Sequence, residues 1–439
     1  MAVPPGRRLA VLLIALALIA IPPVVSRALC LGETCAGSGG TAQRIPFCPL
    51  PGTLKTLIAD GFRSGRSPDV LGVTDSTVLA GGNDPSLHAI PWPAVNPAPD
   101  THVPIALFGN GVDATKPLPG GTGLDQIAPS LSEILGFSRS HPEVRAGVAV
   151  PGIASGSRPR LLVEIVWKGV GTPDLQAMPR SWPYLRGLFD RGGAVATLDG
   201  VTGSVPLDPA ATLTTIGTGG LPYQHGITGT FIRNARGSVT RAWGRGSPPS
   251  VISTLPDDLD FRLHEAPKIG LVAPDLSDRG VIGGTWYVPH DSDDVIVGAG
   301  DPVAAGLLRA GYGADATPDV LAVVLDGSVA RMDARTRGIV SAVRASGVPA
   351  AFVVTATGTS APVIAGVGDS VARAVDATAP RPIVEASVPG GIFLDQGALA
   401  ASGLSSNAAV DAMLAMPDRG EKLFADAFPG FAVSFARYC

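Results

Sequence analysis

The chain has 439 residues, of which 45% are apolar and 16% are charged, with 56 glycines and 41 prolines. This length and composition favour a compact, loop-rich globular protein of one large or two medium domains over a disordered chain. The formal net charge is −4 and no basic run occurs, which argues against a nucleic-acid partner.

The first segment is typical of an export signal. Arg7 and Arg8 precede the apolar run Leu9–Ile21, and Ser26–Ala28 offers a small-x-small cleavage site. The run is shorter than the ~20 residues that a membrane-spanning helix needs. We therefore predict an extracytoplasmic protein, secreted or in the cell envelope, from which a signal peptide of residues 1–28 is removed. An uncleaved anchor, which would be the only link to the membrane, is the alternative.

The four cysteines predict disulfides, because an even count in an exported chain is typical of a disulfide framework. They are Cys30, Cys35, Cys48 and Cys439. Four cysteines allow three pairings, and free buried thiols are the alternative. Since Cys439 is far from the other three in sequence, at least one bridge is expected to join the two ends of the mature chain.

Apolar runs and helical spacing predict alternating helices and strands along the chain. In order, we expect a helix at Leu54–Phe62, strands at Asp69–Val73 and Val103–Phe108, a helix at Leu124–Leu135, a strand at Leu161–Trp167, helices at Ser181–Asp190 and Asp208–Gly217, strands at Lys268–Ala273 and Val320–Leu325, a helix at Val329–Val343, a strand at Ala351–Thr355, and short helices around Asn407–Met416 and Lys422–Ala427. Strands that alternate with helices predict an α/β fold with a mostly parallel central sheet and helices on both faces.

The stretch Pro206–Ile227 carries the most specific pattern. Asp208 followed by Pro209 is typical of a helix start, with a carboxylate N-cap and proline at the first helical position. After a short apolar stripe, glycines end the helix, and a Pro-x-x-His-Gly tail follows that includes His225. This stretch resembles the nucleophile segment of the alkaline phosphatase superfamily, in particular its nucleotide pyrophosphatase/phosphodiesterase branch.

A second likeness lies earlier in the chain, at Thr101–Phe137. The sequence HVPIALFGNGV followed by GLDQIAPSLSEILGF resembles the carboxyl-terminal strand, Gly-x-Gly turn and helix of alkaline-phosphatase-type domains. In the family this element follows the metal motifs, whereas here it precedes them. We therefore expect a circular permutation, with an insertion that mimics the motif as the alternative. The resemblance implies a three-layer sandwich in one domain, residues 29–439, in which 29–150 is the permuted element and 158–439 the core and a cap-like tail.

The resemblance also implies two metal ions, usually zinc, held by Asp and His at strand ends, which would catalyse phosphoryl transfer. The positions that matter depart from the pattern. Lys168 stands where the first Asp is expected, Leu207 replaces the nucleophile, and Thr357 follows the strand that should end in Asp-His. Lys168 would repel a metal ion, although it could pair with a phosphate or simply be solvated. Thr202 and Ser204 are weak substitutes for the nucleophile.

Few candidate ligands remain. Asp326 follows a strand, His102 precedes one, and His290 and Asp291 begin an acidic loop; each is a weak metal candidate, since surface histidines and acidic loops are commonly solvated. Asp208, His225, Lys168 and Thr357 are candidates for the remnant of the cleft. His225 is usually a packing and turn residue in the family.

The sequence therefore favours an exported, catalytically inactive alkaline-phosphatase-like protein with a binding or scaffolding role in the cell envelope and no cofactor. Its partner would be an envelope protein or a phosphate-bearing lipid or glycan. The alternative is a metal-dependent phosphodiesterase or phosphatase, with zinc, in which the ligands have been relocated.

Overall fold

The computed structural model describes residues 46–435 apart from 80–86, 88–89, 191, 285, 288–292, 299–305, 360–365 and 419–420. The chain from Ile45 onward forms one compact unit, and all the described residues belong to it. The predicted signal segment, and His290 and Asp291, lie outside the described residues. Within the described part of the chain, no helix is long and apolar enough to cross a membrane.

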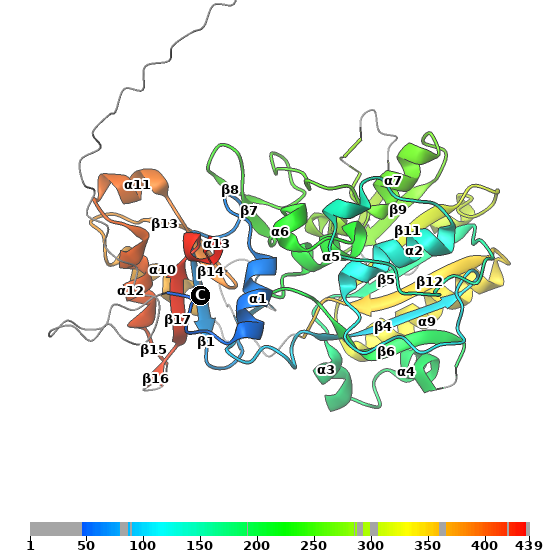
Figure 1. Cartoon of the computed structure of the whole chain (residues 1–439), viewed down its shortest axis with the longest axis horizontal. Helices are drawn as coiled ribbons and strands as arrows, with labels where there is room; N and C mark the ends of the chain where they lie inside the picture. The colour runs from blue at the N-terminus through cyan, green and yellow to red at the C-terminus, as the bar shows by residue number, and fades with distance from the viewer. Residues whose placement is uncertain are drawn as a thin grey trace, which may run out of the picture. The chain divides into compact units, whose positions relative to one another are not determined.

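The largest element is a seven-stranded mixed sheet with the order β10-β9-β11-β5-β12-β4-β6 (Figure 1). Its strands are β4 (His102–Gly109), β5 (Leu161–Trp167), β6 (Ala194–Val201), β9 (Ile269–Ala273), β10 (Asp294–Val297), β11 (Asp319–Leu325) and β12 (Ala350–Ala356). Only β4 runs against the other six. The prediction of an α/β fold with a mostly parallel sheet is therefore confirmed.

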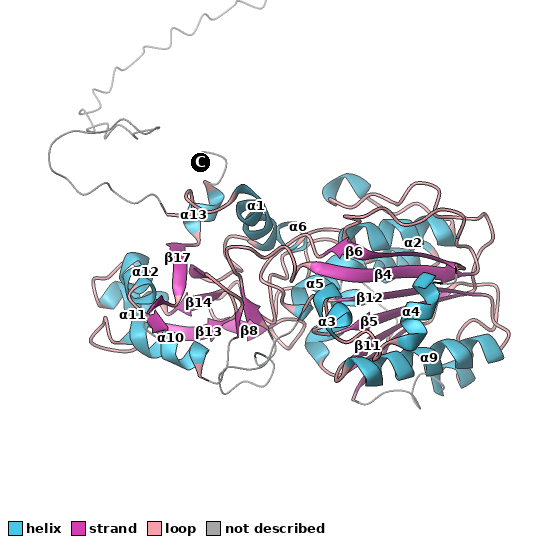
Figure 2. Ribbon diagram, turned by 90° about the horizontal axis from the view of Figure 1, so that it is seen from below, coloured by secondary structure: helices cyan, strands magenta, loops and turns pink. Residues whose placement is uncertain are grey.

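Helices cover both faces of this sheet (Figure 2). One face packs against α2 (Ile127–Leu135), α5 (Pro209–Thr218) and α7 (Leu255–Arg262) through a core of aliphatic side chains. The other packs against α3 (Thr172–Ala177), α4 (Pro183–Asp190) and α9 (Val329–Ala345). Because β5 is covered on both sides, all seven of its residues are buried, Glu164 as well as the six apolar ones.

A second, antiparallel sheet joins the two ends of the described chain. Its order is β13-β14-β1-β17, with bounds Val384–Val388, Gly391–Leu394, Val70–Thr74 and Phe424–Pro429. It packs against α10 (Val367–Asp376), α11 (Gln396–Ala401) and α12 (Ser406–Leu414). The prediction of a helix at Lys422–Ala427 is wrong. Because β1 is fully buried and needs a partner along its open side, pairing with β17 overrides the helical propensity of that segment.

The remaining elements are short. They are α1 (Gly52–Gly61), β2 (Val78–Leu79), β3 (Pro91–Trp92), η2 (Leu124–Gln126), η3 (Pro142–Val144), α6 (Pro222–His225), β7 (Phe231–Arg233), β8 (Val239–Arg241), η4 (Leu276–Val281), β15 (Pro417–Asp418), β16 (Glu421–Lys422) and α13 (Phe431–Ser434). The predicted single helix Leu124–Leu135 is thus divided into η2 and α2. Pro129 explains the division, because proline fits only the first turn of a helix, where its missing N–H has no partner to lose.

The segment beside Cys48 lies against the last strand of the chain. The ring of Phe47 meets that of Phe428 edge to face, with centroids 5.0 Å apart. Cys48 is not a free thiol, while the other three cysteines lie outside the described residues. The pairing of the cysteines therefore stays a prediction, although the two ends that a bridge would join are neighbours in the fold.

Candidate ligand pocket

A pocket of about 500 Å³ opens at the carboxyl ends of the parallel strands β5 and β11. Lys168 follows β5, Asp326 follows β11, and Leu207 and Pro209 begin the segment that leads into α5. In open α/β sheets, ligands bind in the crevice outside the carboxyl ends of the strands. The pocket therefore occupies the part of the fold where a functional site is expected.

Lys168 is held at the edge of this pocket by an ion pair. Its backbone N–H donates to the carbonyl of Leu325 at 2.8 Å, which continues the pairing of β5 with β11. Its Nζ donates to Oδ1 of Asp278, also at 2.8 Å, and the side chain of Asp278 is completely buried in η4. Burial raises the pKa of the Asp278 carboxyl, and the charge of Lys168 opposes that rise. Lys168 therefore neutralises a buried carboxylate.

Leu207, which the resemblance would align with a nucleophile, lies in the same pocket and has no reactive group. Leu207 is 7% exposed, and its methyl groups lie against Gly358, where a Cβ would come within 3.2 Å of them. Gly358 follows Thr357, whose Oγ1 accepts a hydrogen bond from the Gly169 N–H at 2.8 Å. Lys168, Leu207 and the Thr357–Gly358 turn are thus neighbours in the fold.

Asp208 serves the start of α5 and does not face this pocket. Its Oδ1 accepts hydrogen bonds from the N–H of Ala210 and the hydroxyl of Thr230, both at 2.9 Å, and its Oδ2 accepts from the N–H of Thr230 at 2.7 Å. Burial raises the pKa of Asp208, and the bonds from Thr230 oppose that rise. Three donors satisfy this carboxylate, so its role is to cap the helix and fix the loop at Thr230.

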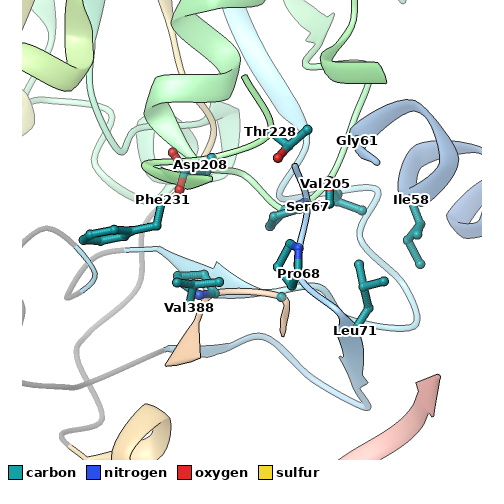
Figure 3. A pocket seen from close by; sticks show the side chains of 14 residues that line it. Ile58, Gly61, Ser67, Pro68, Leu71, Val205, Asp208, Thr228, Phe231 and Val388 are labelled. Atoms are coloured by element: carbon teal, nitrogen blue, oxygen red, sulfur yellow. The ribbon is translucent and has the colours of Figure 1, made fainter. Parts of the chain in front are cut away.

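Asp208 also borders a much smaller cavity, of about 20 Å³, together with Ser67, Thr228 and Phe231 (Figure 3). A space of that size holds about one water molecule. The Thr228 hydroxyl is buried there without a hydrogen-bond partner among the described residues. The cavity therefore suits an ordered water and is too small for an organic ligand.

The other predicted site residues are dispersed. His225 is fully buried; its Nε2 lies 3.1 Å from the Thr215 hydroxyl and its Nδ1 accepts from the Ile227 N–H. Burial lowers its pKa well below the usual value, so His225 is a neutral packing and turn residue. Thr202 and Ser204 are buried in the loop before α5, and His102 begins β4; none of the three lines the pocket.

The described residues contain no group of three or more His, Cys, Asp or Glu side chains that could hold a metal ion. The metal candidates Asp326 and His102 therefore do not meet in a ligand set within the described chain. No model of a known protein family matches this chain, and no curated protein matches it significantly.

Two polar residues of the site were missed by the sequence reasoning. Asp278 follows Asp275 at the spacing of a capping pair, and its contact with Lys168 spans 110 residues. Asp174 lines the pocket and accepts hydrogen bonds from the Gly171 N–H and the Thr359 hydroxyl. Only the capping pattern around Asp275 was visible as a sequence signal, and it does not indicate a partner on β5.

The ion pair gives a first prediction. In a Lys168→Met variant the buried Asp278 carboxylate loses its cation, so the free energy of unfolding should fall by about 2 kcal/mol. In the double variant Lys168→Met/Asp278→Asn the uncompensated charge is removed, and most of this loss should be recovered. Urea unfolding of the two single variants and the double variant measures the coupling; strictly additive losses would show that the pair has no such role.

Proposed function

We propose that this protein is an exported, catalytically inactive relative of the alkaline phosphatase superfamily that acts by binding a ligand or partner in the cell envelope. One observation carries the proposal. The pocket at the strand ends is open, yet it presents Leu207 at the nucleophile position and a lysine already paired with Asp278 at the first ligand position. A pocket at the expected place that lacks the groups required for the reaction is consistent with such an inactive relative.

The position of β4 supports a circularly permuted fold of this family. β4 pairs with β12, the last strand of the large sheet to be reached along the chain, although β4 belongs to the first quarter of the sequence. In the sheet, β4 lies beside β12, where a strand that followed β12 in an unpermuted chain would lie. The contact between Phe47 and Phe428 supports the same proposal, because the present ends of a permuted chain were joined in the unpermuted one and so lie close together.

The side chains at this pocket argue against two-metal catalysis. At the position expected for the first metal ligand, Lys168 cannot coordinate a divalent ion, and the buried Asp278 carboxylate beside it is already bound to that lysine. Leu207 offers no atom that could attack phosphorus. A binding role needs neither metal nor nucleophile. The partners that fit the family resemblance are an envelope protein or a phosphate-bearing lipid or glycan.

The test combines metal analysis with an activity assay on the purified mature protein. We expect no stoichiometric zinc or manganese and no hydrolysis of bis(p-nitrophenyl) phosphate, with or without added Zn²⁺ or Mn²⁺. Two bound metal ions per chain, with turnover that a chelator abolishes, would overturn the proposal. That result would favour the alternative, a metal-dependent phosphodiesterase with relocated ligands.

A further inference from the structure

The charge of the pocket at the ends of β5 and β11 does not suit a phosphate group. Of the described residues that line it, Lys168 is the only cation, while Asp174 and Asp326 are carboxylates. The ammonium of Lys168 is paired with the Asp278 carboxylate, whose Oδ1 lies 2.8 Å from Nζ. A bound phosphate would therefore approach two carboxylates and a lysine that is already neutralised.

The N-terminus of α9 would attract an anion, whereas the starts of α3 and α5, which also border the pocket, are capped by the carboxylates of Asp174 and Asp208. Ser328 caps this helix and lines the pocket. A helix N-terminus contributes roughly half a positive charge, and it acts only within about one turn. Two carboxylates outweigh that contribution, so the pocket as a whole favours a positive ligand.

The remaining wall of the pocket is apolar. Ile90, Val170, Met178 and Leu207 line it, and Met178 is 41% exposed although it is a large apolar residue. A flexible thioether side chain adapts its shape to an apolar ligand group. The pocket thus combines an exposed carboxylate, that of Asp326, with an apolar surface that has room for a chain of several carbons.

A metal ion is a poorer match than an organic cation. The described carboxylates are too dispersed to form a group of three ligands around one ion, whereas a protonated amine needs only one carboxylate at hydrogen-bond distance. We propose that this pocket binds an organic cation, a protonated amine attached to an apolar group, with Asp326 as the counter-ion. This inference rests on the proposed binding function and specifies the chemistry of the ligand.

Two probes with the same apolar chain and opposite charge test the inference. Calorimetric titration of the full mature protein should show saturable binding of n-hexylamine at pH 7, at least about tenfold tighter than that of n-hexyl phosphate. Asp326→Asn should weaken the binding of n-hexylamine by about tenfold, because a charge-assisted hydrogen bond is lost. Asp315→Asn, at an exposed aspartate that precedes β11, is the matched control and should leave the affinity unchanged.

Tighter binding of n-hexyl phosphate than of n-hexylamine would overturn the inference and favour a phosphate-bearing ligand. So would an Asp326→Asn variant that binds n-hexylamine as well as the wild-type protein does. These outcomes are independent of the metal and hydrolysis assays. Absence of both hydrolysis and n-hexylamine binding would contradict this inference alone. Metal-dependent hydrolysis would contradict the proposed function.

Discussion

Replacing Asp258 by asparagine should lower the free energy of unfolding by about 4 kcal/mol. Asp258 is the carboxylate shared by two buried arginines: its Oδ2 accepts from Nε of Arg139 at 2.7 Å and lies 3.4 Å from Nη2 of Arg145. All three side chains are at most 4% exposed. Asparagine would leave two buried guanidinium groups without the carboxylate that contacts both of them.

The surroundings compensate only part of this charge. Both arginines donate to the carbonyl of Thr218, at the end of α5, where the helix dipole is negative. Burial, and secondarily Arg139, lowers the pKa of Arg145 to about 10. That value is still well above neutral pH, so Arg145 is charged in the wild-type protein, and the Asp258 carboxylate is one of the groups that keep its pKa from falling further.

The matched control is Asp190→Asn. It breaks an Arg–Asp pair of the same kind, with Arg186, but both side chains are more than half exposed. Exposed pairs contribute about 0–1 kcal/mol, so this variant should unfold almost as the wild-type protein does. Urea unfolding of both variants measures the two losses of stability. If Asp258→Asn were as stable as Asp190→Asn, the cluster of Asp258, Arg139 and Arg145 would not hold the segment after α2 against α5 and α7.

Replacing Glu164 by leucine should raise stability above neutral pH, by about 4 kcal/mol at pH 8 and above. Glu164 lies in the middle of β5, is 1% exposed, and its two carboxyl oxygens have no hydrogen-bond partner among the described residues. Burial raises its pKa to about 8 from the usual 4.5, a rise that Arg139 partly opposes. The folded protein therefore holds a proton that the unfolded chain releases above about pH 4.5.

The sign of the pH dependence follows from that proton. Between about pH 4.5 and pH 8 the folded state binds one more proton than the unfolded state at this residue, so stability falls as the pH rises, by up to about 1.4 kcal/mol per unit. Glu164→Leu removes this slope. Glu164→Gln should remove it too, while keeping a buried polar group that still costs stability.

Urea unfolding from pH 5 to pH 8.5 measures the difference between each variant and the wild-type protein, which cancels the contributions of other carboxyl groups. Glu133→Leu, at an exposed position of α2, is the control and should keep the wild-type slope. A Glu164→Leu variant whose stability follows pH as the wild-type protein does would mean that the carboxyl is not titrating in this window.

Local patterns predicted the core of the large sheet and the start of α5. The strand Leu161–Trp167 has the predicted bounds, because six of its seven residues are apolar and such a run is typical of a strand buried on both faces. Asp208 accepts a hydrogen bond from the Ala210 N–H, as its capping pattern predicts, and the helix ends at Gly219 in the left-handed conformation. These features depend on residues within one or two turns of each other.

The features that were missed depend on contacts between distant segments. Nothing near Lys168 in sequence indicates Asp278 as its partner, and the propensity of Lys422–Ala427 does not reveal that β1 requires a neighbour there. The strand β6 was also missed, because its buried residues alternate with partly exposed ones and β4 alone among the described strands pairs with it. The sequence could predict a cleft at the strand ends, but it could not predict the net charge of the pocket, because that charge depends on the distant contact between Lys168 and Asp278.

The place of β4 in the sheet has a consequence for the order in which the protein can fold. The hydroxyl of Thr355 donates to the carbonyl of Pro104 across 251 residues, and the carboxylate of Asp69 holds the N–H of Leu394 across 325. Chains dominated by such distant contacts fold slowly, because the entropy of closing long loops must be lost before the contacts form. The early strands β1 and β4 are therefore expected to pair late in folding, because β4 pairs with β12 and β1 pairs with β17 near the other end of the chain.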